Sequence, residues 1–174
     1  MYKIAVTGPE STGKSALTQA LAAHYNCPFV CEFAREYVEK LDRPYNFDDI
    51  KAIARHQIEA ENYYSENKIA DFVFFDTELI ITKVWFEYCY GEAPDFVHQA
   101  LMTKYFDLYL LCEPDLAWEP DPVREHGDDR DYFYERYKQE IILLQKPFFS
   151  INGTGQIRIQ HAIGAIESFI NNQK

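Results

Sequence analysis

Apolar and polar positions follow two different periods along the 174-residue chain. Five short apolar runs have the length and residue types of β-strands, and longer segments with apolar residues three and four positions apart separate them. This alternation is typical of a parallel sheet that helices cover on both faces. The pattern predicts an α/β fold in a single domain over residues 1–174, with strands at Tyr2–Thr7, Pro28–Cys31, Phe72–Phe75, Leu108–Cys112 and Phe148–Ile151.

Helix boundaries can be recognised between these runs. Asn46 is a typical N-cap because two aspartates follow it in the first turn. Gly91 is expected to end the helix that follows the third strand. The expected helices cover residues 14–25, a segment that begins near 33, residues 46 to about 67, the segment before 91, and residues 157–171.

The net charge of the chain limits the kinds of molecule that it can bind. The formal net charge is −11, from 17 Lys and Arg against 28 Asp and Glu, and a protein of this sign lacks the cations that neutralise a nucleic-acid backbone. No apolar stretch reaches the roughly 18 uninterrupted residues that a membrane span needs. We therefore expect a cytoplasmic protein that binds neither nucleic acid nor membrane, and homo-oligomerisation stays open.

Cysteine usage agrees with this location. The four cysteines lack the close pairing of a zinc site, and three of them lie in apolar runs or helical patterns, where Cys is usually a small core residue. We expect reduced thiols at Cys27, Cys31, Cys89 and Cys112.

The stretch GPESTGKS, residues 8–15, has the spacing of a phosphate-binding loop at every fixed position and lies between a predicted strand and a predicted helix. Its glycines allow backbone N–H groups to converge on phosphate oxygens. Lys14 is expected to reach the β and γ phosphates of ATP, and Ser15 to ligate Mg²⁺. The predicted nucleotide-binding residues are Gly8, Glu10, Ser11, Thr12, Gly13, Lys14, Ser15 and Ala16.

Two carboxylates follow predicted strands. Asp76 ends the run DFVFFD and should face the crevice of the phosphate loop, because ligands bind at the carboxyl ends of parallel strands. It is a candidate for Mg²⁺ coordination or for the general base, and capping of the next helix is compatible with both roles. Glu32 leaves the second strand in the same way and is the second candidate for the base. The sequence leaves this choice open.

The segment EPDLAWEPDPVREHGDDRD, residues 113–131, contains three prolines and no clear period, which predicts a long functional loop. Arg124 and Arg130 are candidates for stabilising the transition state of phosphoryl transfer when a mobile loop closes as a lid. Surface ion pairs with neighbouring acids are the alternative.

Further side chains are candidates for contact with the acceptor. Gln57 is polar but lies on the inward stripe of its helix, so its amide needs a partner. Trp85 shares a helical face with Ile81, and Trp118 lies in the polar loop, where a ring suits a flat ligand. The predicted substrate contacts are Glu32, Arg35, Tyr37, Gln57, Asp76, Trp85 and Trp118.

The order and spacing of GPESTGKS, CEFAREY, IARHQIEAE, FFDTE, TKVWFEYCYG and DLYLLCEPDLAWEPDPVREHGDDR resemble the ribosylnicotinamide kinase domain of bacterial NadR proteins, within the P-loop kinase superfamily. The likeness covers nearly the whole chain. It implies a P-loop NTPase fold with strand order 2-3-1-4-5 and ATP and Mg²⁺ as cofactors. It also implies transfer of the γ phosphate to the 5′-hydroxyl of nicotinamide riboside, giving nicotinamide mononucleotide.

One departure from the family pattern is visible. The family often reads Asp-Thr-Asp after the third strand, and this chain has Asp76-Thr77-Glu78, so a metal role for Glu78 is left open. The chain begins one residue before its first strand, so we expect kinase activity alone, without the DNA-binding or adenylyltransferase domains of NadR proteins.

The acceptor has weaker support from the residues themselves. An acidic protein with tryptophans beside its site suits a pyridinium cation through stacking and cation–π attraction. Two other readings stay open: a P-loop kinase for another nucleoside or small metabolite, and a nucleotide-binding sensor without turnover.

Overall fold

The computed structural model describes residues 1–103, 106–121 and 127–173. Within these residues the strands form one five-stranded parallel sheet in the order β2-β3-β1-β4-β5. The predicted fold class and strand order are therefore confirmed, and each strand agrees with its predicted bounds to within one residue at either end. The strands are β1 (Tyr2–Thr7), β2 (Phe29–Val30), β3 (Phe72–Asp76), β4 (Leu108–Cys112) and β5 (Phe148–Ile151).

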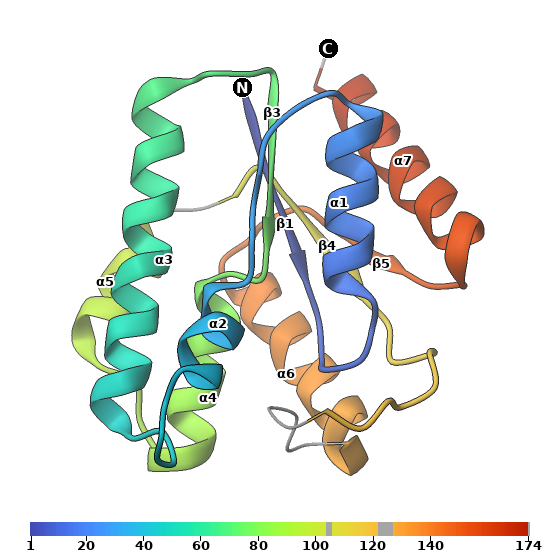
Figure 1. Ribbon diagram of the computed structural model, residues 1–174. Coiled ribbons are helices and arrows are strands. Elements are labelled where there is room, and N and C mark those ends of the chain that lie inside the picture. The colour runs from blue at the N-terminus through green and yellow to red at the C-terminus, as the bar shows by residue number, and fades with distance from the viewer. Residues whose placement is uncertain (104–105, 122–126, 174) are drawn as a thin grey trace.

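Helices cover both faces of this sheet (Figure 1). α1 (Lys14–His24) and α7 (Gly155–Asn171) lie on one face, and α3 (Phe47–Asn67) lies on the opposite face. The other helices of that second side are α4 (Leu79–Tyr90), α5 (Asp95–Thr103) and α6 (Arg130–Leu143), while the short α2 (Phe33–Glu39) follows β2.

The central strand β1 separates two apolar cores. Ile4 and Val6 pack with α1 and α7, whereas Ala5 packs on the other side. All three side chains are fully buried. This alternation follows from the two-residue period of a strand, and burial of each larger side chain stabilises the fold by about 1.5–3 kcal/mol.

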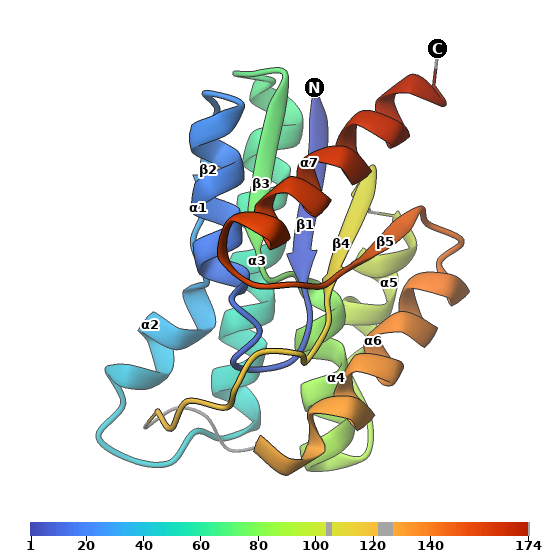
Figure 2. The ribbon, with the colours of Figure 1, turned by 90° about the vertical axis from the view of Figure 1, so that its right-hand side faces the viewer.

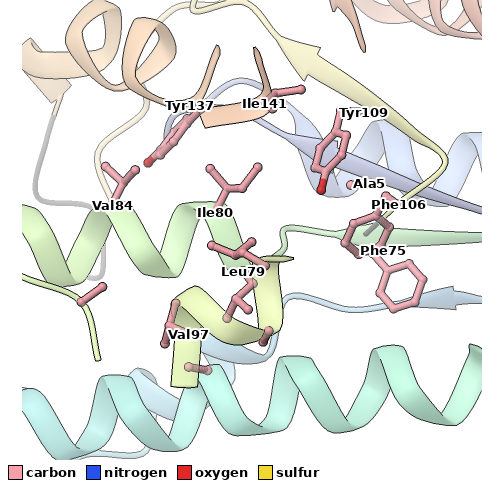
Figure 3. Close-up of a cluster of buried hydrophobic side chains, with 14 of the residues drawn as sticks. Ala5, Phe75, Leu79, Ile80, Val84, Val97, Phe106, Tyr109, Tyr137 and Ile141 are labelled. Atoms are coloured by element: carbon pink, nitrogen blue, oxygen red, sulfur yellow. The ribbon is translucent and has the colours of Figure 1, made fainter. Parts of the chain in front are cut away.

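The second core joins α4 to α6. Figure 3 shows Ile80 and Val84 of α4 facing Tyr137 and Ile141 of α6. All four side chains are buried, so these two helices form one packed layer beneath the carboxyl ends of the strands.

Charged side chains also connect α4 and α6. The ammonium of Lys83 lies 2.8 Å from Glu140 and 2.7 Å from Glu87. The guanidinium of Arg136 contacts the same two carboxylates at 3.3 and 2.8 Å. Because Lys83 and Glu140 are buried, loss of one partner would leave an uncompensated charge, which is strongly destabilising. By contrast, α2 has no buried residue.

Several boundaries confirm their predicted signals. The Asn46 side chain accepts hydrogen bonds from the N–H groups of Asp48 and Asp49 at 2.9 and 3.2 Å. The Asp49 carboxylate accepts in return from the N–H of Asn46 at 2.8 Å, which completes a capping box. Gly91 ends α4 with a left-handed φ of 83°.

Two expectations differ from the structure. The predicted loop 113–131 ends early, because Gly127–Asp129 form a 3₁₀ turn and Arg130 begins α6. Phe133, Tyr137 and Ile141 recur every fourth residue on its buried side, a helical pattern that the high charge of the preceding segment obscured. The helix α5 over Asp95–Thr103 was also not predicted.

The cysteines agree only in part with their prediction. All four are free thiols, as expected. Only Cys112 is buried, whereas Cys31 and Cys89 are exposed, so their apolar sequence surroundings were misleading. Among the described residues, no helix is long and apolar enough to cross a membrane.

Replacing Asn46 with Ala should remove the cap of α3 and lower the free energy of unfolding by about 1 kcal/mol. Urea denaturation of the purified protein measures this change. Asn46→Ser, which keeps a capping oxygen, should retain most of the stability. Equal stability of the alanine variant and the wild type would show that the capping box contributes nothing.

Candidate active site

The phosphate-binding loop follows β1 and lies close to the end of β4. Gly8 has φ 140°, and a Cβ atom built on it would lie 2.7 Å from the carbonyl oxygen of Cys112. Only glycine fits such an approach. The hydroxyl of Thr12 and the ammonium of Lys14 donate hydrogen bonds to the carbonyl of Pro9 at 2.8 and 2.7 Å. In this conformation the ammonium of Lys14 therefore bonds to the backbone of the loop itself.

A cavity of about 410 Å³ opens from this loop. Each of the eight predicted nucleotide-binding residues lines it, and so do Glu32, Arg35, Gln57 and Trp85 from the predicted substrate contacts. The structure therefore brings the phosphate loop and much of the predicted acceptor site to one space. The remaining lining residues are Ala34, Val38, Tyr45, Thr77, Ile81, Thr82, Tyr88, Phe133 and Tyr137.

Asp76 ends β3 beside Val6 of β1. Its carboxylate accepts a hydrogen bond from the hydroxyl of Ser15, and burial, with a smaller contribution from the charge of Glu32, raises its pKa to about 6. Its Oδ1 atom is buried and, within the described residues, has no hydrogen-bond partner. A hydroxyl and an unsatisfied carboxylate oxygen side by side are hard donors of the kind that Mg²⁺ prefers, so these residues fit the predicted metal site.

Glu32 and Asp76 occupy different positions around the cavity. Glu32 is the N-cap residue of α2, although its side chain makes no capping hydrogen bond, and it lines the main cavity. Asp76 instead lines a neighbouring cavity of about 20 Å³. Of these two acids, Glu32 is therefore the one that lines the larger cavity.

Aromatic side chains also line this cavity. The rings of Tyr45 and Trp85 lie 4.8 Å apart at 74°, the edge-to-face arrangement that aromatic pairs favour. Gln57 is satisfied by a side chain, because the hydroxyl of Thr82 donates to its Oε1 at 2.7 Å. The predicted inward position of Gln57 therefore agrees with its contacts.

The sequence analysis missed several cavity residues. Tyr88 follows Trp85 by three positions on α4, and Phe133 and Tyr137 are four positions apart on α6. Their helical spacing was a usable signal. Tyr45 gave none, because it precedes the α3 cap in a segment without period.

The chain after β4 runs under the phosphate loop toward α2 (Figure 2). The Ser11 hydroxyl donates to the carbonyl of Ala117 at 3.3 Å and accepts from the N–H of Glu119 at 3.1 Å. Further along, Arg35 of α2 forms an ion pair with Asp121. We call residues 113–121 the β4 segment.

Three other predicted site residues, Arg130, Trp118 and Tyr37, are not among the described residues that line the cavity. Arg130 donates to the carbonyl of Leu116 at 2.8 Å and lies 5.9 Å from the ring of Trp118, so both residues stabilise the β4 segment. The Tyr37 hydroxyl donates to Asp49 at 3.2 Å. Arg124 lies outside the described residues.

Comparison with known proteins agrees with this geometry. Residues 3–158 match the family described as AAA domain. The chain belongs to the AAA domain family. It is also homologous to the "Trifunctional NAD biosynthesis/regulator protein NadR" of Salmonella typhimurium, with 32% identity over 135 residues. The match covers 74% of this chain and 32% of that relative, so this AAA domain chain corresponds to about a third of its curated relative.

Two solved structures of NadR proteins share the fold of this AAA domain. One, in complex with NR (nicotinamide riboside), is 26% identical with a TM-score of 0.79 and covers 97% of this chain and 51% of that one. The other, in complex with NAD and AMP-PNP, is 27% identical with a TM-score of 0.73 and covers 97% and 49%. The predicted resemblance to NadR proteins is confirmed.

Glu78 is the N-cap residue of α4. Its two carboxylate oxygens accept hydrogen bonds from the hydroxyl of Thr7 at 3.0 Å and from the N–H of Ile80 at 2.6 Å. Burial raises its pKa from 4.5 to about 7. Both oxygens are used within the fold, which gives Glu78 a structural role.

This pKa predicts a pH-dependent stability. Between about pH 4.5 and pH 7 the unfolded chain carries an ionised Glu78 while the folded one keeps the proton, so stability falls by about 3 kcal/mol as pH rises. Glu78→Gln should remove this contribution, so its stability relative to wild type should rise between pH 4.5 and 7. Urea denaturation across this range measures it.

Glu66→Gln, at an exposed glutamate of α3, is the matched control and should follow the wild-type pH profile. Parallel profiles for Glu78→Gln and wild type would contradict the prediction.

Proposed function

We propose that this protein is an ATP-dependent kinase that transfers the γ phosphate to the 5′-hydroxyl of nicotinamide riboside and forms nicotinamide mononucleotide. The observation that carries the proposal is the single cavity of about 410 Å³, which joins a complete phosphate-binding loop to an aromatic pocket. Homology to NadR proteins, solved with NR and with NAD and AMP-PNP, supports the same reaction.

The charges around the cavity suit this acceptor. Among the described residues, its lining contains the acids Glu10 and Glu32 and the basic residues Lys14, in the phosphate loop, and Arg35, which pairs with Asp121. A pyridinium ring is attracted to the faces of Tyr45 and Trp85 and to the carboxylates. An acceptor that already carried phosphate would need further cations at this end.

The phosphate loop holds the nucleotide. Its backbone N–H groups and the amino end of α1 bind phosphate oxygens, and the Lys14 ammonium moves from the carbonyl of Pro9 to the β and γ phosphates. Ser15 and Asp76 would hold Mg²⁺, which would neutralise charge on the phosphates. The adjacent hydroxyl and unpartnered Oδ1 support this assignment.

Glu32 is the general base in this proposal. It lines the main cavity, whereas Asp76 contacts Ser15 and lines the smaller space. A carboxylate that faces the acceptor takes the proton of the attacking 5′-hydroxyl, and one bound to Mg²⁺ is a weaker base. Oriented proton transfer of this kind contributes about 10²–10⁴-fold in rate.

The β4 segment serves as the lid. It already contacts the phosphate loop through Ser11 and α2 through Arg35. Arg130 bonds the backbone of this segment at Leu116, and with Arg124 it supplies positive charge for the transition state when the lid closes.

A coupled assay of ADP release should show turnover with nicotinamide riboside and ATP·Mg²⁺. Thymidine, a neutral nucleoside, is the comparison acceptor and should be turned over at least about 10-fold less efficiently, because it lacks the cation–π attraction. Turnover with thymidine but none with nicotinamide riboside would make the protein a kinase for another acceptor. Nucleotide binding without turnover would make it a sensor.

Two substitutions separate the roles of the carboxylates. Glu32→Gln should lower kcat by about 10²–10⁴-fold with the Mg²⁺ requirement unchanged, because it removes the base. Asp76→Asn should instead raise the Mg²⁺ concentration needed for half-maximal rate. Steady-state kinetics over a Mg²⁺ titration distinguish them.

Glu36→Gln, on the same short helix but exposed and paired with Lys40, is the matched control and should keep wild-type kinetics. If Glu32→Gln keeps the wild-type kcat while Asp76→Asn loses it at saturating Mg²⁺, Asp76 is the base.

A further inference from the structure

Thr77 adopts a backbone conformation that is unusual for its residue type. Five non-glycine residues of the described chain have positive φ. Three of them, Asn26, Lys68 and Gln145, are exposed residues at the carboxyl ends of helices, where left-handed residues are common. Ser11 belongs to the phosphate loop. Thr77 has φ 69°, is buried and is the only β-branched member.

Left-handed backbone is strongly unfavourable for a β-branched residue. Such strain persists where the surroundings fix the conformation, and it concentrates at functional sites. Here the N–H of Thr77 donates to the carbonyl of Val6 at 3.0 Å, and the next residue, Glu78, is fixed by Thr7 and Ile80. None of these bonds uses the threonine side chain, so glycine would make them without strain.

The conformation sends three successive side chains in three directions. Asp76 contacts Ser15, Glu78 turns into the interior with 2% of its surface exposed, and Thr77 lines the main cavity between the phosphate loop and α4. Thr77 therefore lies where the part of the cavity next to the phosphate loop meets the part that is proposed to bind the acceptor.

The hydroxyl of Thr77 is available for a ligand. Thr82, the neighbouring threonine of the lining, already donates to Gln57. Among the residues that the structure describes, the Thr77 hydroxyl has no hydrogen-bond partner. Closure of the site would expel water, and a polar group left without a partner there is costly.

We propose that Thr77 is a catalytic residue whose hydroxyl hydrogen-bonds the reacting end of the acceptor and orients the hydroxyl that attacks the γ phosphate. The inference rests on the proposed kinase function and adds a substrate contact to it. A threonine hydroxyl both donates and accepts, so it can bind an alcohol while Glu32 accepts that alcohol's proton. The strained backbone is retained because it aims this hydroxyl into the cavity.

The test compares Thr77→Val with Thr77→Ser in steady-state kinetics. Valine keeps the shape and removes the hydroxyl, so kcat/KM for nicotinamide riboside should fall by about 10–100-fold. KM for ATP should stay within about 2-fold, since phosphate binding is untouched. Serine keeps the hydroxyl and should stay within about 3-fold of wild type.

Thr77→Gly is a second variant that tests the same role if Thr77→Val fails to fold. Glycine adopts this φ freely, so its melting temperature should equal or exceed that of wild type while kcat/KM for the acceptor falls as for valine. Thr18→Val is the matched control, because the Thr18 hydroxyl in α1 likewise has no hydrogen-bond partner within the described residues, but Thr18 is not among the residues that line the cavity. Its kinetic constants should match wild type.

Three results would overturn the inference. The first is a kcat/KM for the acceptor in Thr77→Val and Thr77→Gly that equals that of wild type. The second is an equal loss of kcat/KM for ATP and for the acceptor. The third is a loss of acceptor kcat/KM in Thr77→Ser as large as in Thr77→Val. If the wild type itself turns over no acceptor, the proposed function fails and the Thr77 role fails with it. Wild-type turnover with unaffected Thr77 variants refutes only the role of Thr77.

Discussion

The central place of β1 in the sheet is the constraint on which the site depends. Parallel pairing with β3 on one side and β4 on the other aligns the ends of all three strands. That alignment brings Asp76 beside the phosphate loop and Cys112 beneath it. The loop fits there only because Gly8 has no side chain, since a Cβ atom at this position would lie 2.7 Å from the carbonyl oxygen of Cys112. One missing side-chain atom therefore allows the nucleotide loop to rest directly on the sheet.

Buried polar groups then define the floor of the site. Glu78 uses both carboxylate oxygens to join β1 to the start of α4, and the preceding residues face Ser15 and the cavity. A longer acid than the Asp usual in the family reaches the interior at this position. The departure noted in the sequence is thus compatible with the fold, because Glu78 has a structural role and the proposed metal site would use Ser15 and Asp76 instead.

Features that depend on neighbouring residues were predictable from the sequence. The strands, the phosphate loop and the Asn46 cap follow from local patterns, and all eight predicted nucleotide-binding residues line the cavity. Features that depend on packing between distant elements were not. The sequence could not show that Tyr37 bonds Asp49 of α3 or that Trp118 packs beside Arg130. Charge around residues 113–131 concealed the start of α6, since composition carried more weight there than the four-residue spacing of Phe133 and Tyr137.

The ion-pair network between α4 and α6 has a mechanical consequence. Four charged side chains form ion pairs that hold these helices together over a shared apolar core: Lys83, Glu87, Arg136 and Glu140. The side of the cavity that carries Trp85 and Tyr137 is therefore rigid. The opposite wall, α2, buries none of its residues, and elements with few buried contacts open at low free energy. We therefore expect α2, with Glu32 at its start and Arg35 within it, to adjust its position when a ligand binds, whereas α4 and α6 keep theirs.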